Sequence, residues 1–312
     1  MKIFKWITKD TNIDFLKFRK PAYILSLLMC LLSVWSIAFN GFNYGIDFSG
    51  GILIEVKSAN KINVEKVRKE LAVVALDDLN LQSIGETGDE MMIRAQAKGL
   101  DEKAQMAAVN QIKQTLGAGY EYRKVELVGP QVGDELKKAG IIASVLAILA
   151  ISIYIWFRFE WQFAIGAMVG LSHDVLITVG LLSLFRFDIS LTTIAAILTL
   201  AGYSVNDTVV NYDRVRENLR KFKKMPQYDL LNKSINDIFS RTILTSLTTL
   251  LAALALLMFG GDVLRSFSFV IVMGVLIGTY SSIYVSTTLM NLFNLRAAQN
   301  AEKNINPFGN VE

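Results

Sequence analysis

Six long apolar segments dominate the pattern of hydrophobic and polar positions along the chain. Each contains about 18 or more residues with few charges, which is typical of a helix that spans a membrane. The segments cover residues 22–39, 138–157, 163–182, 189–210, 242–259 and 267–289. This pattern predicts an integral membrane protein of the all-α class with six transmembrane helices.

A polar region, residues 41–136, separates the first two apolar segments. The stretch GILIEVK alternates apolar and polar side chains, as a half-buried strand does. The stretch YEYRKVELV alternates in the same way, except for a slip near Lys124. Between them, LQSIGETGDEMMIRAQ predicts a β-hairpin that turns near Gly88.

Two helical stretches complete this region. NVEKVRKELAVVAL and DEKAQMAAVNQIKQTL each place apolar residues on one helical face. The resulting order β-α-β-β-α-β is that of the ferredoxin-like split motif. We therefore expect a ferredoxin-like α+β domain inserted between transmembrane helices 1 and 2. This fold by itself identifies no function.

Lysine and arginine gather in the amino-terminal tail and in the connection after the fourth apolar segment. That connection contains Arg214, Arg216, Arg220, Lys221, Lys223 and Lys224. The short connections on the opposite side contain only Arg186 and Arg265. Because positive residues mark the cytoplasmic side, we expect both termini in the cytoplasm and the polar region in the periplasm. The same asymmetry accounts for the net charge of +4, so nucleic-acid binding is not needed to explain it.

These considerations divide the chain into five parts. They are a cytoplasmic tail over residues 1–21, transmembrane helix 1 over 22–40, the periplasmic domain over 41–136, transmembrane helices 2–6 over 137–290 with a cytoplasmic loop near 212–240, and a cytoplasmic tail over 291–312. Within that loop, PQYDLLNKSINDIF places Leu231, Ile235 and Ile238 on one face. This spacing predicts a short helix that lies on the inner membrane surface.

Several classes of chemistry find no support in the sequence. The single cysteine, Cys30, lies inside the first span and allows no intrachain disulfide and no cysteine-based metal site. GIDFSGG, residues 45–51, lacks the spacing of a phosphate-binding loop, so we interpret it as a tight exit from the first span. With no nucleotide loop or nucleophile constellation either, we expect no enzymatic activity, no cofactor and no metal.

Ionisable residues inside the predicted spans are the strongest functional signal. Each costs at least about 2.5–3.5 kcal/mol at the centre of a span, so each is a functional candidate by default. His173 and Asp174 lie in the third span, and Asp207 lies near the end of the fourth. Arg241 stands at the entrance of the fifth span.

Helix geometry gives an approximate depth for these groups. With a rise of about 1.5 Å per residue, His173 lies roughly 15 Å from the inner edge and Asp207 about 6 Å from it. Arg241 matches Asp207 in level, whereas His173 and Asp207 differ by roughly 9 Å. Ser204 and Asn211 share one helical face with Asp207. Asp207 and Arg241 form either a static ion pair or a titrating site, and their chemistry alone leaves both open.

Five motifs resemble the SecD/SecF family of bacterial protein-export membrane proteins, within the resistance-nodulation-division (RND) superfamily. They are GIDFSGG, GPQVGDEL, HDVLIT, AAILTLAGYSVNDTVVNYDRVREN and SRTILTSLTTLLAALALLMFGG. The resemblance extends from the first span through the sixth. It implies a half-transporter that supplies six of twelve spans and pairs with SecD. The pair would use the proton motive force to drive or complete preprotein translocation across the cell inner membrane.

The same resemblance assigns roles to residues and partners. It implies that Asp207 and Arg241 form a proton relay. Nearby polar residues are candidate accessory positions, namely His173, Asp174, Ser204 and Asn206. The expected coupling ion is H⁺, with Na⁺ as the alternative. The implied partners are SecD, the SecYEG translocon with SecA, YajC and YidC, translocating preproteins and membrane lipid.

Two other functions stay open at this point. An ion-gradient-driven half-transporter for a small molecule or lipid would carry the same polar residues. A purely structural subunit of a membrane assembly would carry an ion pair that never titrates. The small-molecule or lipid transporter would differ from a protein-export subunit in the proteins with which it associates. The structural subunit would differ from both in that its function does not depend on the membrane potential.

Overall fold

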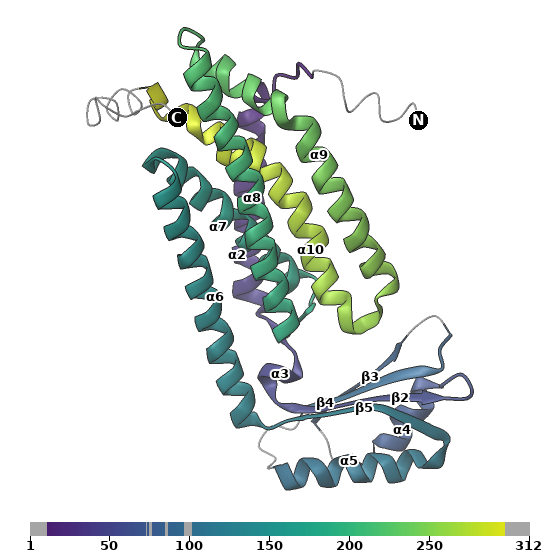
Figure 1. The fold of residues 1–312 in the computed structure, drawn as a ribbon. Coiled ribbons are helices and arrows are strands. Elements are labelled where there is room, and N and C mark those ends of the chain that lie inside the picture. The colour runs from purple at the N-terminus through teal and green to yellow at the C-terminus, as the bar shows by residue number, and fades with distance from the viewer. Residues whose placement is uncertain (1–10, 73, 75–76, 85–86, 97–101, 297–312) are drawn as a thin grey trace.

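The computed structural model describes residues 11–72, 74, 77–84, 87–96 and 102–296. Within this part of the chain, six helices are long and apolar enough to cross a membrane. They pack into an elongated bundle, and a sheet domain lies beyond one end of it (Figure 1). The six predicted spans are therefore confirmed.

The spans correspond to six labelled helices in Figure 1. They are α2 (Arg19–Asn40), α6 (Pro130–Arg158), α7 (Trp161–Leu184), α8 (Leu191–Lys221), α9 (Gln227–Phe259) and α10 (Gly261–Ser281). A short 3₁₀ turn, η1 (Leu16–Phe18), precedes α2. The sixth span continues beyond α10 through the π-helical turn η3 (Ser282–Thr287) and the 3₁₀ turn η4 (Met290–Leu292).

Burial divides these helices into a centre and a periphery. More than half of the apolar window is buried in α7 (56%) and in the last span (61%), but only 22% or less in α2, α6 and α9. A helix that is apolar all round either lies in a core or faces lipid, and these peripheral helices expose their apolar side chains. The buried polar groups of the bundle are concentrated on α7, α8 and α10.

Glycines allow the central helices to approach one another closely. A Cβ atom at Gly166 would collide with Met290 and Tyr212, and one at Gly274 would collide with Leu200. Small residues have this effect in membrane bundles because they let helix backbones approach. The packing of α7 and α10 is therefore tight enough to hold buried polar side chains in fixed positions.

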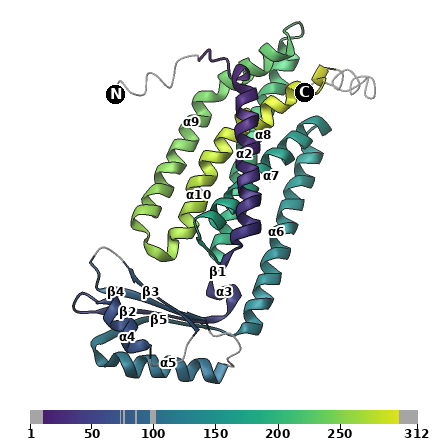
Figure 2. The same cartoon turned by 180° about the vertical axis from the view of Figure 1, so that it is seen from behind.

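The sheet domain lies between α2 and α6 in the sequence. Its elements are β2 (Gly51–Ser58), α4 (Val64–Leu71), β3 (Asp77–Ile84), β4 (Glu90–Gln96), α5 (Glu102–Leu116) and β5 (Tyr120–Val128). The strands are antiparallel in the order β3-β4-β2-β5. β4 therefore lies between β2 and β3, and β2 pairs with both β4 and β5, as in the predicted split motif. Helices α4 and α5 lie on the face of the sheet that points away from the bundle (Figure 2).

Two local predictions for the sheet are confirmed. β3 and β4 form the predicted hairpin, and Gly88 in its turn has a φ of +69°, which favours glycine. The alternation of β5 slips because its pairing register with β2 shifts where the partners pass from Lys124 to Tyr122. Arg123 is the extra residue of a β-bulge there.

GIDFSGG forms the junction between the sheet domain and the bundle. After α2, β1 (Asn43–Tyr44) pairs in parallel with β6 (Asp188–Ile189), and the short helix α3 (Ile46–Ser49) follows. Asp47 in α3 accepts a hydrogen bond from the backbone nitrogen of Leu191 at 2.8 Å, at the first turn of α8. Acidic side chains satisfy the free N–H groups of a helix start in this way.

The second linker, at the start of α6, packs against this junction. A Cβ atom at Gly133 would lie 3.1 Å from the backbone nitrogen of Gly50 and 3.2 Å from the carbonyl oxygen of Phe48. Gly50 itself has a φ of +69°. The two chain segments that connect the sheet domain to the bundle are therefore in direct contact, which joins the motifs GIDFSGG and GPQVGDEL in space.

The connection between the fourth and fifth spans differs from the sequence prediction. In place of a loop near residues 212–240 with a separate surface helix, α8 runs to Lys221 and α9 begins at Gln227. Pro226 stands at the N-cap of α9, where a proline does not interrupt a helix. The apolar stretches of the fourth and fifth spans show only how much of each helix lies in the membrane. Helices α8 and α9 both continue beyond these stretches, where Leu230 and Leu231 of α9 pack in the hydrophobic core.

Candidate functional site

Asp207 is buried in the centre of the bundle, on the polar face of α8. Ser204, Asp207 and Asn211 are spaced three and four residues apart, so they share one helical face as predicted. All three are buried, and the Asp207 side chain is 5% exposed. Its Oδ2 atom is buried and has no hydrogen-bond partner in the described part of the chain. A buried, unpaired carboxylate oxygen costs free energy and therefore requires an explanation.

One turn along α8 from Asp207, two side chains hold the irregular end of the sixth span. Asn211 donates a hydrogen bond to the carbonyl oxygen of Ser282 at 3.1 Å, and Tyr212 donates one to that of Ser286 at 3.2 Å. Both carbonyls belong to η3, the π-helical turn. Such turns are rare and frequently lie at functional sites, because they break the regular helical ladder. Asp207 is thus next to the least regular part of the membrane bundle.

The structure places Arg241 on the outer surface of the bundle. Arg241 is exposed, and within the described residues no ion pair joins it to Asp207. The next residue, Thr242, is buried, and Ser246 one turn later bonds to Thr279 of α10 at 2.7 Å. Because α9 packs through these two residues, the preceding side chain points outward. The direct Asp207–Arg241 contact that their matching level suggests is not formed within this chain.

Asn206, the other candidate accessory residue on α8, is also exposed. The same face of α8 carries Gly202, beside which a Cβ atom would meet nothing within 4 Å. Polar groups of a span are costly in lipid and are normally covered by protein. This face of α8, with Gly202 and Asn206, and the exposed Arg241 on α9 therefore have the character of a contact with another membrane protein.

Asp174 is the most completely enclosed carboxylate of the spans. It is 0% exposed, and it accepts hydrogen bonds at Oδ2 from Ser204 at 2.5 Å and from Ser281 at 2.6 Å. Its Oδ1 lies 2.8 Å from Nδ1 of His173. These groups come from three helices, α7, α8 and α10. Hydrogen bonds to a charged acceptor contribute about 1.5–3 kcal/mol each, so this cluster binds the three helices together.

His173 connects this cluster to α2. Its ring lies 6.3 Å from that of Tyr280, whose hydroxyl donates to the carbonyl oxygen of Ala22 at 2.7 Å and contacts the Ser26 hydroxyl at 3.0 Å. The other ring nitrogen of His173, Nε2, is buried and has no partner in the described part of the chain. The imidazole therefore has one nitrogen on a carboxylate and one that is free to bind.

The sequence did not predict Ser281 as a member of the site. Hydroxyl residues are weak signals in a hydropathy pattern, although the run Ser281, Ser282, Ser286, Thr287 and Thr288 is buried throughout. The depth estimate placed the inner edge near residue 211, but α8 runs to Lys221. Ser204 bonds to Asp174 and precedes Asp207 by three residues, or about 4.5 Å of rise.

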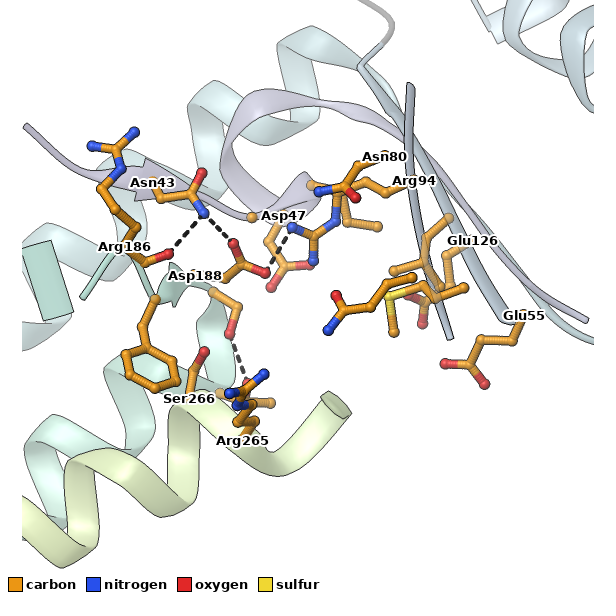
Figure 3. Close-up of a pocket in the computed structure, with 18 of the residues that line it drawn as sticks. Asn43, Asp47, Glu55, Asn80, Arg94, Glu126, Arg186, Asp188, Arg265 and Ser266 are labelled. Atoms are coloured by element: carbon orange, nitrogen blue, oxygen red, sulfur yellow. Dashed lines mark hydrogen bonds and ion pairs between the residues drawn. The ribbon is translucent and has the colours of Figure 1, made fainter. Parts of the chain in front are cut away.

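A separate cleft of about 430 Å³ lies between the sheet and the loops at that end of the bundle. Figure 3 shows Arg94 of β4 reaching Asp188, with an ion pair of 2.7 Å, while Asn43 also donates to Asp188 at 2.5 Å. Among the described residues, no three His, Cys, Asp or Glu side chains come together as a metal site would require. The cleft walls are of mixed charge, and its ion pair fastens the sheet domain to the bundle.

Two family models match the chain. Residues 108–296 match the model described as protein export membrane protein SecD/SecF, C-terminal, and residues 35–61 match the SecD/SecF GG motif. The second match includes the glycine pair of GIDFSGG, which forms the junction described above. The first match includes all the buried polar residues of α7, α8 and α10.

Individual relatives agree with these models. The protein translocase subunit SecF of Rickettsia rickettsii is 45% identical over 286 residues, which cover 90% of this chain and 92% of that protein. The crystal structure of SecDF, a translocon-associated membrane protein from Thermus thermophilus, superimposes with a TM-score of 0.77 at 34% identity and covers 93% of this chain. A second structure, of SecDF in a super-membrane-facing form, gives a TM-score of 0.68. The chain spans 39% of the first SecDF chain, so it corresponds to part of that longer polypeptide.

Proposed function

The chain belongs to the SecD/SecF family of protein-export membrane proteins, and from that premise we propose that it is a proton-driven subunit of the Sec translocase accessory complex. Together with SecD it uses the proton motive force to drive or complete preprotein translocation. Its role is transport, without catalytic chemistry of its own. The observation that carries the proposal is Asp207, a carboxylate buried inside a span with one oxygen that has no partner in the described residues.

The energy available from protons is sufficient for this role. One proton that crosses 100 mV releases about 2.3 kcal/mol. A free energy of that size changes the ratio of two conformations about fifty-fold, since each 1.4 kcal/mol is a factor of ten. H⁺ is the proposed coupling ion because a carboxylate with a free oxygen accepts a proton without further ligands, and Na⁺ is the alternative to be tested.

Protonation of Asp207 would act on the packing of α8 and α9. The ionised carboxylate attracts the cation of Arg241 on α9, and the neutral acid does not. Asn211 and Tyr212 fasten the following turn of α8 to η3, so a movement of α8 is transmitted to the sixth span. The proton enters from the periplasmic side and leaves toward the cytoplasm, and the two states of the bundle differ in the position of these helices.

We propose SecD as the partner that covers the outward face of α8 and α9. That face carries Gly202, Asn206 and Arg241, which are polar or small and exposed within a span. A second set of six spans completes the twelve-span plan of the family and removes these groups from lipid. The assembly acts beside SecYEG with SecA, YajC and YidC, and it contacts the translocating preprotein.

The protein is a multi-pass membrane protein, which we place in the cell inner membrane with both termini cytoplasmic and the sheet domain periplasmic. The basic connection between α8 and α9 lies at the end of the bundle opposite the sheet domain (Figure 1). Single cysteines at Lys113 and Lys223, in a Cys30→Ser background, should be labelled from opposite sides of the membrane. Labelling of both by an impermeant reagent outside intact spheroplasts would contradict this orientation.

The test of the function is preprotein translocation into inverted membrane vesicles, with and without a proton gradient. We expect Asp207→Asn to assemble with SecD and to lose the increment in export that the gradient produces. Asp213→Asn is the matched control, because Asp213 is on the same helix in a half-exposed ion pair with Arg158. If Asp207→Asn keeps the increment, the proton-relay function is wrong, and the structural-subunit alternative is favoured. Dependence on a Na⁺ gradient instead would change the ion but retain the site.

A further inference from the structure

The Asp174 cluster is more elaborate than helix packing requires. A carboxylate with no exposed surface is held by two hydroxyls and an imidazole from three different helices. An uncharged amide or a third serine would join the same helices without the cost of burying a charge. The use of an ionisable pair, Asp174 and His173, therefore calls for a function beyond packing.

A second observation indicates that something binds beside this cluster. His173 is 7% exposed, and its Nε2 atom has no partner within the described residues. The hydroxyl of Ser286, which is fully buried, also has none. It lies against Gly170, one helical turn before His173, where a Cβ atom would collide with it. Two buried polar atoms without protein partners on neighbouring turns are what a path for protons or water leaves free.

We propose that Asp174 and His173 form a second proton-binding site, which passes its proton to Asp207 by way of Ser204. This inference rests on the proposed proton-driven function and adds a site to it. Asp207 lies about 4.5 Å of helical rise beyond Ser204 on the same face, nearer the cytoplasmic end. The hydroxyl of Ser204 is therefore the group that stands between the two carboxylates.

The transfer can be written as two balanced steps. With its proton on Nδ1, the neutral imidazole accepts a proton at Nε2, and the Nδ1 proton moves to the Asp174 carboxylate, which becomes a carboxylic acid. The Asp174 carboxyl group then rotates so that this proton faces Ser204, and the Ser204 hydroxyl turns its own proton away from Asp174. Ser204 accepts the carboxylic-acid proton at Oγ and releases its hydroxyl proton toward Oδ2 of Asp207, directly or through one water. At the end, Asp174 is ionised again, Asp207 carries the proton, and the imidazole is neutral with its proton on Nε2, from which it returns to the Nδ1 form by proton exchange.

The groups around the site are compatible with a proton relay. From α10 and η3 it is faced by Tyr280, Ser281 and Ser286, from α8 by Ser204, and from α2 by Cys30, whose thiol is within electrostatic range of Asp174. Within the described residues, His173 is the basic group that pairs with Asp174. Among these described residues no Lys or Arg is paired with the Asp174 carboxylate, so proton transfer between Asp174 and His173 remains reversible.

Infrared difference spectroscopy tests the proposal on the assembled complex with SecD in lipid. Surface carboxylates also titrate, since this chain alone has 28 Asp and Glu residues, so the pH-difference spectra of two variants are compared with each other. On a change from basic to acidic pH, Asp207→Asn should show a carboxylic-acid C=O component that shifts when His173→Gln is added. Identical carboxyl bands in the two variants would overturn the proposal, because no titrating acid would then be bonded to His173. This measurement does not depend on whether substitutions of Asp174 itself fold.

Export assays supply the second arm. Asp174→Asn keeps the size of the side chain and an oxygen that can accept from Ser204 and Ser281, while its amide NH2 group faces His173 as a donor. It should reduce the gradient-driven increment in export at least tenfold. Asp213→Asn is the matched control and should leave the increment unchanged. If Asp174→Asn exports normally while Asp207→Asn fails, the second site is wrong and the proposed function stands. If both export normally, both are wrong.

Discussion

Asp174 and Asp207 are two carboxylates in the same bundle whose surroundings differ in one decisive respect. Asp174 accepts hydrogen bonds from two hydroxyls and contacts an imidazole, whereas an oxygen of Asp207 has no partner in the described part of the chain. The side chains around Asp174 come from three helices, whereas Oδ2 of Asp207 is bound by none of the described residues. The difference teaches that burial alone does not define the role of a carboxylate: the hydrogen bonds of Asp174 also hold three helices together, whereas Oδ2 of Asp207 contributes no such bond within the described residues.

The sharpest way to break this comparison is to move the free carboxylate. In Asp207→Arg with Arg241→Asp, opposite charges are preserved, but the acid is placed on the outer surface of α9. We expect the gradient-driven increment in export to be lost as completely as in Asp207→Asn, because the carboxylate no longer lies on the buried face. A static ion pair would be rescued by the swap, as coupled partners are. The measurement is the preprotein export rate of the double variant and the wild type at matched expression. Near-normal export by the double variant would contradict the proton-relay role of Asp207.

Removal of the donors to Asp174 tests the other half of the comparison. Ser204→Ala with Ser281→Ala should lower the free energy of unfolding by about 2–5 kcal/mol, because a buried carboxylate loses two hydrogen bonds. Asp207→Asn should cause no such loss, since Oδ2 of Asp207 accepts no hydrogen bond from the residues that the structure describes. Thermal unfolding of the complex in detergent measures both. Equal destabilisation by the two changes would show that the sites do not differ as described.

Glycine substitutions sharpen the same contrast through packing. In Gly274→Ala, the new methyl group collides with Leu200, and we expect a cost of about 1–3 kcal/mol from overpacking. Gly278→Ala is the matched control one turn later, where the methyl group would lie 3.5 Å from Ser204 and 3.6 Å from Asp174. These are ordinary contacts, so the change should stay within about 0.5 kcal/mol. Thermal unfolding midpoints of the two variants measure this difference. A lower midpoint for Gly278→Ala than for Gly274→Ala would contradict the described packing.

The smallest effect is expected at the ion pair outside the membrane. Arg94 and Asp188 are 2.7 Å apart but partly exposed, and Asn43 also donates to Asp188. Arg94→Gln should therefore change stability by about 0–1 kcal/mol, and less at high salt. Unfolding of the purified complex at two salt concentrations measures this. If Arg94→Gln lowered the free energy of unfolding as much as Ser204→Ala with Ser281→Ala, the exposure of Asp188 and the burial of Asp174 would not account for the difference between the two sites.

Much of the fold follows from local pattern, because each element carries its own signal. The six spans, the hairpin at Gly88 and the slip of β5 near Lys124 were all predictable from hydropathy and alternation. The end of α8 and the start of α9 were not. Their polar turns resemble a loop in sequence, but the backbone stays helical because Leu230 and Leu231 pack against the core.

The site was predictable only in part, for a similar reason. Asp207 and Asp174 stand out because charges are rare in spans, and the shared face of Ser204 and Asp207 follows from helix geometry. Which helices meet is a property of tertiary packing, so the hydrogen bond from Ser281 to Asp174 and the outward position of Arg241 have no local signature. A pairing inferred from equal depth alone cannot distinguish an inward side chain from an outward one.

Proton movement during export tests the central claim most directly. Inverted vesicles that contain the complex, an outwardly directed proton gradient and a pH-sensitive dye in the lumen can report proton flux while a preprotein is translocated. We predict that export by the wild type and by Asp213→Asn is accompanied by proton release from the lumen, and that Asp207→Asn abolishes both this release and the gradient-driven increment. Wild-type proton release and wild-type export by Asp207→Asn would contradict the account.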